Sequence, residues 1–204
     1  MITRDLLMKY CPHAQPEYLD SFEKSKAWLE RTGTATTPLR AAHFLTQAIS
    51  ASRFLFFQSE SLWFTAREIS ERWPRLFPSA SDALSIAGKE KDLAEAIYGG
   101  RIGNGENNGD AWKYRARGIF RIVGKNNYAA ISRMIGADLV EKPDLVFGPD
   151  FAVACAVTIY NLRSAPTPAE RDDVQMVTTR MGGRIDEVPE RRELLLKLKA
   201  DLGA

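Results

Sequence analysis

The sequence predicts a mainly α-helical protein with one small β element near its middle. Most of the chain divides into segments whose apolar residues recur at spacings of three and four, as on one face of a helix. These segments begin or end at Pro and Gly residues, which punctuate helices. One stretch differs: in residues 113–124 basic residues alternate with aromatic or apolar ones, which indicates a short strand or hairpin.

Five helices are expected in the first half of the chain. They lie at residues 6–10, 18–29, 39–50, 65–78 and 89–100. Thr37 and Pro38 have the residue types of a helix cap and a first turn, so they predict the start of the third helix. Thr65 and Glu68 have the spacing of a capping box at the start of the fourth.

The second half opens with a long loop over residues 99–112, which are rich in Gly and Asn. The β element follows, and after it four more helices are expected at residues 126–136, 151–162, 166–183 and 189–203. The second of these helices is apolar on all sides, so we expect it to be buried completely.

The composition is that of a soluble globular protein with its own core. Of the 204 residues, 45% are hydrophobic and 26% are charged. The net charge of +2 is too small to indicate a nucleic-acid partner. Cys11 and Cys155 are too few for a disulfide framework, and we expect two free buried thiols rather than a pair. With only two histidines, His13 and His43, a histidine-based metal site is not expected, and neither is a cofactor.

The start of the sequence has no apolar run long enough for the core of a signal peptide. No stretch reaches the roughly 20 apolar residues of a membrane span either. We therefore expect the protein to be cytoplasmic as synthesised, and to leave the cell only through a holin or a dedicated secretion system.

Three stretches carry a resemblance to a known family. YGGRIGNGENNGDAWKYRARGIFRIVGKNNY (98–128) resembles the central motif of glycoside hydrolase family 19, Y-G-G-R-M-G-N followed by G-D-G-W-R-Y-R-G-R-G-x-I-Q-L-T-G-R-x-N-Y. AHFLTQAISASRFLFFQSE (42–60) is similar, without a gap, to A-H-F-L-A-Q-x-x-H-E-S-G-G-F-x-x-x-x-E, and VTTRMGGR (177–184) to V-T-R-R-I-N-G-G. The resemblance covers about residues 40–195 and is strongest to the bacterial and phage branch, chitinases and endolysins that cut β-1,4-linked amino sugars.

The resemblance implies an α+β, lysozyme-like fold, in which two α-helical lobes surround a cleft and one lobe carries a small β-hairpin. We predict a single domain over 1–204, made of an N-terminal helical segment at 1–38 and a family 19-like core at 39–195. The resemblance also implies an inverting mechanism with two carboxyl groups, one protonating the leaving oxygen and the other activating a water on the opposite face of the sugar.

This chain departs from the family pattern at the catalytic positions. The acid of H-E-S is replaced by Ala51 and the His before it by Ser50, whereas the second Glu is retained as Glu60. The Thr whose hydroxyl helps to hold the water is replaced by Val123, which has no hydrogen-bonding group in its side chain. The Asn of N-G-G is replaced by Gly182.

Two further departures add charge to the expected cleft. Arg53 stands where the family has Gly, and Arg121 where it has Gln. We expect both side chains to project toward the former active site, where they either pair with Glu60 or receive an anionic group. Phe54 and its aromatic neighbours add bulk, so a narrowed or plugged cleft is expected.

Four other residues are candidates for ligand binding because they stand in register with the family motif: Trp112, Tyr114, Asn104 and Tyr128. The aromatic members could stack on sugar rings. Aromatic side chains at such spacings also serve as core residues, and this second interpretation stays open.

We predict that the protein is chitinase- or endolysin-like but without hydrolase activity, a pseudoenzyme that binds peptidoglycan, a chitin-type glycan or a protein partner. One alternative is an active inverting muramidase or chitinase, such as a prophage endolysin, that uses Glu60 with an acid relocated to Glu106, Asp110 or Glu68. Another is a structural or regulatory partner in a phage or secretion assembly. Nucleic acid is not an expected partner, because the basic and aromatic stretch matches the hydrolase hairpin.

Overall fold

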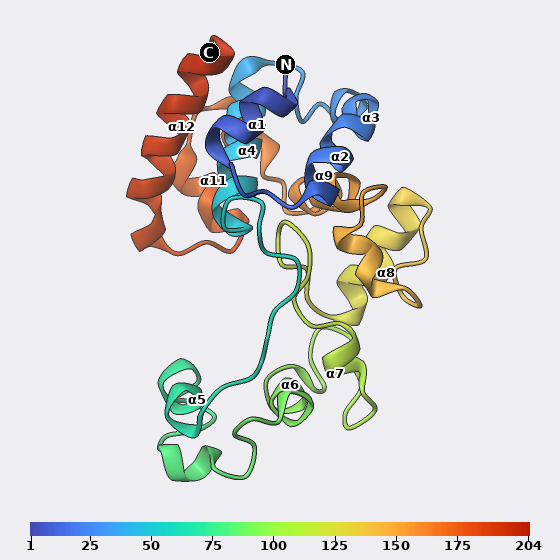
Figure 1. The fold of residues 1–204 in the computed structure, drawn as a ribbon, viewed down its shortest axis with the longest axis vertical. Helices are drawn as coiled ribbons and strands as arrows, with labels where there is room; N and C mark the ends of the chain where they lie inside the picture. The colour runs from blue at the N-terminus through green and yellow to red at the C-terminus, as the bar shows by residue number, and fades with distance from the viewer.

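The structure, a computed structural model, describes all 204 residues and is almost entirely helical (Figure 1). Its helices form a large group that contains both chain ends and a small group below it, here called the large lobe and the small lobe (Figure 1). The large lobe contains α1 (Arg4–Tyr10), α2 (Pro16–Lys24), α3 (Lys26–Arg31), α4 (Pro38–Ala51), α8 (Lys125–Ile135), α9 (Ala152–Leu162), α10 (Pro166–Glu170), α11 (Val174–Arg180) and α12 (Val188–Leu202). The small lobe contains α5 (Ala66–Arg72), α6 (Glu90–Tyr98) and α7 (Asp110–Lys113). Short 3₁₀ turns lie at η1 (Ala80–Ala83), η2 (Pro143–Phe147) and η3 (Ile185–Glu187).

Each lobe has its own hydrophobic cluster. The large lobe buries 38 residues around α4 and α9, and the small lobe buries only seven. Residues 152–160 of α9 are all buried, which confirms the prediction of a helix that is apolar on all sides. Because α4 packs against α10, α11 and α12, its last residue is held firmly at the edge of the large core.

The predicted helix starts that lead toward the site are confirmed. The Thr37 hydroxyl accepts a hydrogen bond from the Arg40 amide at 3.3 Å, and Pro38 occupies the first turn of α4. Thr65 and Glu68 form the predicted capping box at the start of α5. These caps set where the two helices begin on either side of the extended segment that joins the lobes (Figure 1).

Two predicted helices are each broken into two. The segment 18–29 changes direction at Ser25, which separates α2 from α3. The segment 166–183 breaks between α10 and α11, where Asp172 has a left-handed φ of 57°. The apolar spacing continues across both breaks because the paired helices face the same core.

The predicted β-hairpin is reduced to two isolated antiparallel bridges, and no strand is formed. Arg117 bridges to Ser59 on one side and to Ile122 on the other. The chain reverses between Gly118 and Arg121, both with positive φ, and the Arg121 amide donates to the Gly118 carbonyl at 3.1 Å. Only Lys113 of the stretch predicted to be extended lies in α7, and the reversal at residues 118–121 takes up its middle, so the arms on either side form isolated bridges.

Cys11 and Cys155 are both buried and free, as predicted. Burial raises the pKa of each thiol to about 12, so neither forms a thiolate at neutral pH. None of the helices combines the length and the apolar character that crossing a membrane requires.

Candidate functional site

Three segments that are distant in sequence meet between the lobes: the end of α4, residues 57–60 and residues 115–123. The Glu60 amide donates to the Ala116 carbonyl at 3.0 Å. Since Ser59, Arg117 and Ile122 lie opposite one another, the antiparallel register places Glu60, Ala116 and Val123 in the neighbouring rung. Glu60 and Val123 therefore lie on either side of Ala116. The structure therefore brings these two predicted site residues together.

Glu60 is a partly buried carboxylate with both oxygens engaged. Oε1 accepts a hydrogen bond from the Ala116 amide at 2.7 Å, and Oε2 accepts one from the Tyr98 hydroxyl at 3.1 Å. Burial raises the pKa of Glu60 above its ordinary value, while the two hydrogen bonds and the nearby Arg115 oppose that shift. A carboxyl held in this way is compatible with a general base, because it is fixed in place and only partly stabilised as an anion.

Ala51 ends α4 and presents a methyl group where the family carries its acid. Its carbonyl accepts a hydrogen bond from Arg121 Nε at 3.0 Å, and the Arg121 guanidinium lies 4.6 Å from the centre of the Phe57 ring. Burial lowers the pKa of Arg121 first, and the charge of Arg53 lowers it further. Arg121 thus covers the end of the helix from which a catalytic acid would project.

The predicted pairing of Arg53 and Arg121 with Glu60 is wrong. Neither guanidinium forms an ion pair with Glu60, although Arg121 lies close enough to feel its charge. The reason is local: the Glu60 oxygens are turned to the Ala116 amide and the Tyr98 hydroxyl, while Arg121 is held by the α4 carboxyl end.

The turn after α4 is backbone-strained. Arg53, Phe54 and Leu55 have φ values of 52°, 60° and 58°, in the left-handed region that favours glycine. Each such residue costs about 1–2 kcal/mol relative to a right-handed conformation. The turn persists because Leu55 is fully buried and its amide donates to the Ser52 hydroxyl at 2.8 Å. The family places Gly at the first two of these positions, so the backbone path is kept while the residues that suit it are lost.

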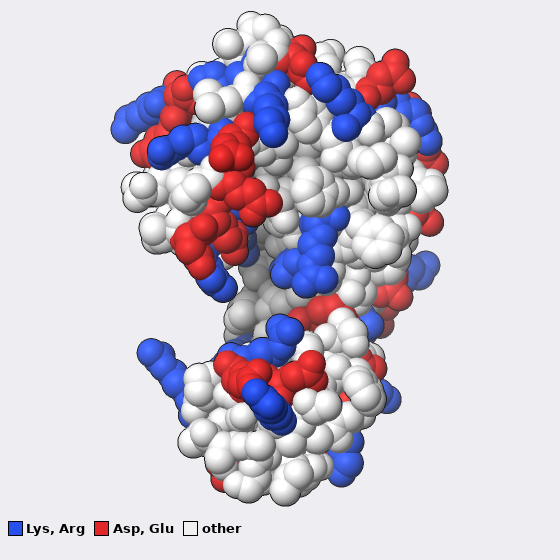
Figure 2. Space-filling view, turned by 60° about the vertical axis from the view of Figure 1, so that its left-hand side comes forward, with Lys and Arg blue, Asp and Glu red and all other residues white.

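An open groove of about 790 Å³ lies beside Ala51 on the large lobe. Its walls come from the turn after α4, from residues 120–121 and from the α11–α12 region, and Figure 2 shows the molecule hollowed between its lobes. Phe54 is 52% exposed beside the groove and does not fill it, so the prediction of a plugged cleft is wrong on this side. Glu60 and Val123 do not line the groove, so Ala51 and Glu60 do not share this cavity.

The structure assigns the four predicted ligand-binding residues mainly to internal contacts. Tyr114 and Tyr128 are buried in the large core, and their hydroxyls donate to the Val140 carbonyl at 3.1 Å and the Arg115 carbonyl at 3.0 Å. A buried ring cannot stack on a sugar from solvent, so for these two the core interpretation is the one the structure favours.

Asn104 and Trp112 also serve internal contacts. The buried Asn104 amide donates to the Tyr98 carbonyl and accepts from the Lys125 amide, which ties the glycine-rich loop to α8. Trp112 is partly buried, and the Arg115 guanidinium covers its ring at 3.8 Å from the ring centre.

The three residues considered as relocated acids are all occupied or distant. Glu68 is fixed in the capping box of α5, and Asp110 accepts hydrogen bonds from the Gly105 amide and from Lys125. Glu106 is exposed at a separate surface pocket with Asp92 and Glu95. None of these carboxylates forms part of the groove beside Ala51.

Sequence reasoning missed two features of the site. Tyr98 opens the Y-G-G-R motif, but its hydrogen bond to Glu60 depends on the path of α6 and has no signature of its own. The buried Arg191 donates to the Gln47 side chain and pairs with Glu187, a network that links α4 to α12 below the groove. No group of three or more His, Cys, Asp or Glu side chains that could hold a metal ion is present.

The comparisons with known proteins agree with this geometry. No family model matches the chain. A glycosyl hydrolase family 19 domain-containing protein of Haemophilus influenzae is 32% identical over 195 residues, which are 95% of this chain and 94% of that protein. Chitinase C from Streptomyces griseus HUT6037 covers 100% of this chain with 77% of its own, at a TM-score of 0.65 and 16% identity. A bacterial family 19 chitinase covers 100% of this chain with 95% of its own, at a TM-score of 0.63 and 19% identity.

The two-lobed helical fold is therefore that of the family 19 chitinases, as the resemblance implied. Together with the full-length relative, it establishes that this chain belongs to glycosyl hydrolase family 19.

Proposed function

We propose that this family 19 chain binds an amino-sugar glycan without hydrolysing it. The observation that carries the proposal is Ala51, since a methyl group at the acid position has no proton to give to the leaving oxygen. General acid catalysis contributes about 10²–10⁴-fold to such reactions. Glycosidic oxygen is a poor leaving group, so the loss of this acid alone makes useful turnover implausible.

The surroundings of Glu60 support the same conclusion. An inverting enzyme needs its two carboxyl groups about 6.5–9.5 Å apart, with the water between them. Glu68 and Asp110 are committed to other contacts, and Glu106 faces a different pocket. Val123 in the rung of Glu60 has no side-chain group to hold the water.

The open groove supports a binding role. It reaches the former acid position and remains accessible, although chemistry has been lost there. A chain retained only as an inert scaffold would have no reason to keep this hollow. Membership of family 19 makes peptidoglycan and chitin-type glycans the candidate ligands.

Two measurements test this proposal. The purified protein should release no reducing ends from chitin oligomers and should not clear permeabilised bacterial cells, while it sediments with insoluble peptidoglycan or chitin. The control is the Glu60→Gln variant: clearing by the unaltered protein that disappears in this variant would show an active hydrolase. Failure to sediment with either polymer would contradict the binding role.

A second candidate function is a protein-binding role in a larger assembly. It rests on Phe54, which lines the groove, and on Phe56 two residues further along; they are 52% and 58% exposed. Neighbouring exposed aromatic side chains are typical of interaction sites. Retention of a protein partner by a protein that ignores both polymers, and loss of that partner in Phe56→Ser, would favour this candidate.

A further inference from the structure

We propose that the groove beside Ala51 binds a carboxylate of an acidic amino-sugar chain through the guanidinium groups of Arg53, Arg121 and Arg163. This inference rests on the proposed glycan-binding function and specifies its ligand: a glycan that carries carboxylates, rather than a neutral one. Nothing in the family pattern supplies this charge, because Arg53 and Arg121 are departures from it.

The three guanidinium groups have no anionic partner. The Arg53 side chain makes no hydrogen bond or ion pair, the Arg121 side chain donates only to the Ala51 carbonyl, and the Arg163 side chain donates only to the Met181 carbonyl at 2.8 Å. Other cations of the groove differ, since Arg191 pairs with Glu187 and Lys9 pairs with Asp201. The groove therefore contains paired cations and three arginines whose side chains form no ion pair, although Glu190 and Glu193 also line it.

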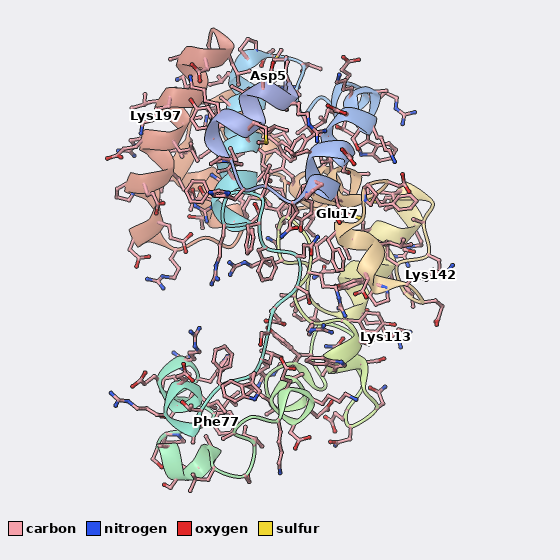
Figure 3. All side chains as sticks on the ribbon, viewed as in Figure 1. Asp5, Glu17, Phe77, Lys113, Lys142 and Lys197 are labelled. Atoms are coloured by element: carbon pink, nitrogen blue, oxygen red, sulfur yellow. The ribbon has the colours of Figure 1, made fainter.

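The remaining charges of the groove lie on one helix. Glu190, Glu193 and Lys197 of α12 line it without forming ion pairs, and the label of Lys197 in Figure 3 marks this wall. In the same view, nitrogen-tipped side chains extend from the lower face of the large lobe into the space between the lobes (Figure 3). Figure 2 likewise shows Lys and Arg side chains beside the hollow.

The electrostatic situation favours an anion. Burial lowers the pKa of both Arg121 and Arg163, and the neighbouring Arg53 lowers that of Arg121 further. Arg53 and Arg121 are close enough for their like charges to repel, and the charges of Glu60 and Glu187 offset only part of this at Arg121. A bound anion would offset the repulsion further. A carboxylate suits this arrangement because guanidinium groups bind it through short charge-assisted hydrogen bonds, often two at a time.

The backbone provides a separate argument. Arg53 and Arg121 have φ values of 52° and 49°, where a residue with a Cβ is strained. Strain of this kind concentrates at functional sites, where the surrounding structure maintains it. Two arginines that lie in one groove, and that are both held in this unfavourable conformation, indicate that their side chains are needed there.

The position of the groove indicates an acidic glycan. Ala51 lines the groove and stands at the family's acid position, so a glycan bound beside it would lie next to Arg53 and Arg121, which line the same groove. Chitin oligomers carry only neutral N-acetyl and hydroxyl groups. Amino-sugar chains with lactyl or peptide carboxylates, as in peptidoglycan, carry the matching charge.

The test compares three probes by isothermal titration calorimetry. They are a peptidoglycan tetrasaccharide with free peptide carboxylates, the same molecule with those carboxylates converted to amides, and tetra-N-acetylchitotetraose. We expect the acidic probe to bind at least about tenfold more tightly than the amidated probe. This is the effect of the charge-assisted hydrogen bonds of one carboxylate. The difference should shrink as salt is raised.

Matched variants assign the effect to the arginines. Arg121→Gln and Arg53→Gly install the family's residues, and each should reduce the preference for the acidic probe several-fold. Arg53→Gly also relieves a strained turn, so we expect this variant to have a raised melting temperature. Weaker binding by such a variant cannot be attributed to misfolding. Phe54→Gly relieves the same turn without removing charge and should keep the preference.

The outcomes separate this inference from the function on which it rests. Equal affinity for the acidic and amidated probes would overturn the carboxylate site while leaving glycan binding intact. Absence of binding to all three probes would overturn both. Equally tight binding of the free acidic peptide, without sugar, would show a peptide ligand and overturn the assignment to a glycan.

Discussion

The two sides of the candidate site, around Glu60 and at the end of α4, differ in how far they follow the family pattern. On the side of Glu60, the carboxylate, its donors Tyr98 and Ala116 and the buried Arg117 form a connected hydrogen-bond network. On the side of α4, the acid is replaced by Ala51 and the turn that follows has left-handed residues without glycine. One side has kept its contacts, and the other has lost both its reactive group and the residues that suit its backbone.

The difference shows that, within one site, the residues required by the fold are distinct from those required by the reaction. Arg117 is only 4% exposed and donates to the carbonyls of Lys113 and Arg115. Its loss would leave the Lys113 carbonyl without a donor, whereas the Arg115 carbonyl still accepts from Tyr128. The α4 side has no such dependence, because a side chain at position 51 points into an open groove. The residues of the family pattern that make internal contacts are present on the Glu60 side, and the acid of the pattern is absent on the α4 side.

The largest expected effect is on hydrolysis. Ala51→Glu alone should give no detectable cleavage of chitin oligomers, because Arg121 beside it would lower the pKa of the new carboxyl by about 1–3 units and keep it ionised. Combining it with Arg121→Gln and Val123→Thr should raise the rate by about 10²–10⁴-fold, measured as reducing ends.

The control for this restoration is the same combination with Glu60→Gln, which should be inactive. Full activity from Ala51→Glu alone would show that Arg121 does not hinder an acid at this position. An inactive triple variant would show that the losses extend to the Glu60 side, which would remove the contrast between the two sides.

The next largest effect concerns stability on the retained side. Arg117→Met should lower the free energy of unfolding by about 2 kcal/mol, since it leaves the Lys113 carbonyl without its donor. Urea denaturation measures this change. The matched control is Arg101→Met, an exposed arginine whose loss should matter by less than about 0.5 kcal/mol. Similar values for the two variants would contradict the structural role of Arg117.

A smaller, opposite effect is expected on the α4 side. Arg53→Gly should raise the free energy of unfolding by about 1 kcal/mol, because glycine tolerates a φ of 52°. Arg53→Ala keeps the Cβ that causes the strain and should give no such gain. In contrast, Leu55→Gly should destabilise the protein, since Leu55 is fully buried. Equal stability of the glycine and alanine variants would mean that the turn is unstrained.

The smallest effect is a pH dependence. Burial raises the pKa of Glu60 above its unfolded value near 4.5, so the folded chain holds this proton to a higher pH than the unfolded chain does. The contribution of Glu60 to stability is then greatest below pH 4.5 and falls as the pH rises through its folded value. Glu60→Gln should therefore gain stability relative to the unaltered protein between acidic and neutral pH. A gain that grows toward acidic pH instead would show that the pKa is lowered.

The sequence was most informative where structure is local. The cap at Thr37, the capping box at Thr65 and the buried helix α9 all follow from short-range spacing. The break between α10 and α11 does not, because Asp172 adopts its left-handed conformation while bonded to His43 at 2.9 Å and Lys199 at 2.5 Å. Those partners are distant in sequence, so the apolar spacing cannot indicate the break.

The sequence could predict which residues form the site, but not the directions of their side chains. Alignment to the family pattern identified Ala51, Glu60 and Val123, and the register brings the last two together. It could not show that Tyr114 points into the core, because a shared residue type does not specify a side-chain direction. Nor could it show that the Ala116 amide donates a hydrogen bond to Glu60, since a backbone amide has no signature in the sequence.

The seven-residue core of the small lobe has a consequence for how the molecule opens. So small a cluster gives little apolar stabilisation, and the amide hydrogens of α5 and α6 should exchange with solvent far sooner than those of α4 and α9. The large lobe is then the stable part of the protein, and the small lobe opens more readily. A polymer that contacts both lobes would slow amide exchange most in the small lobe.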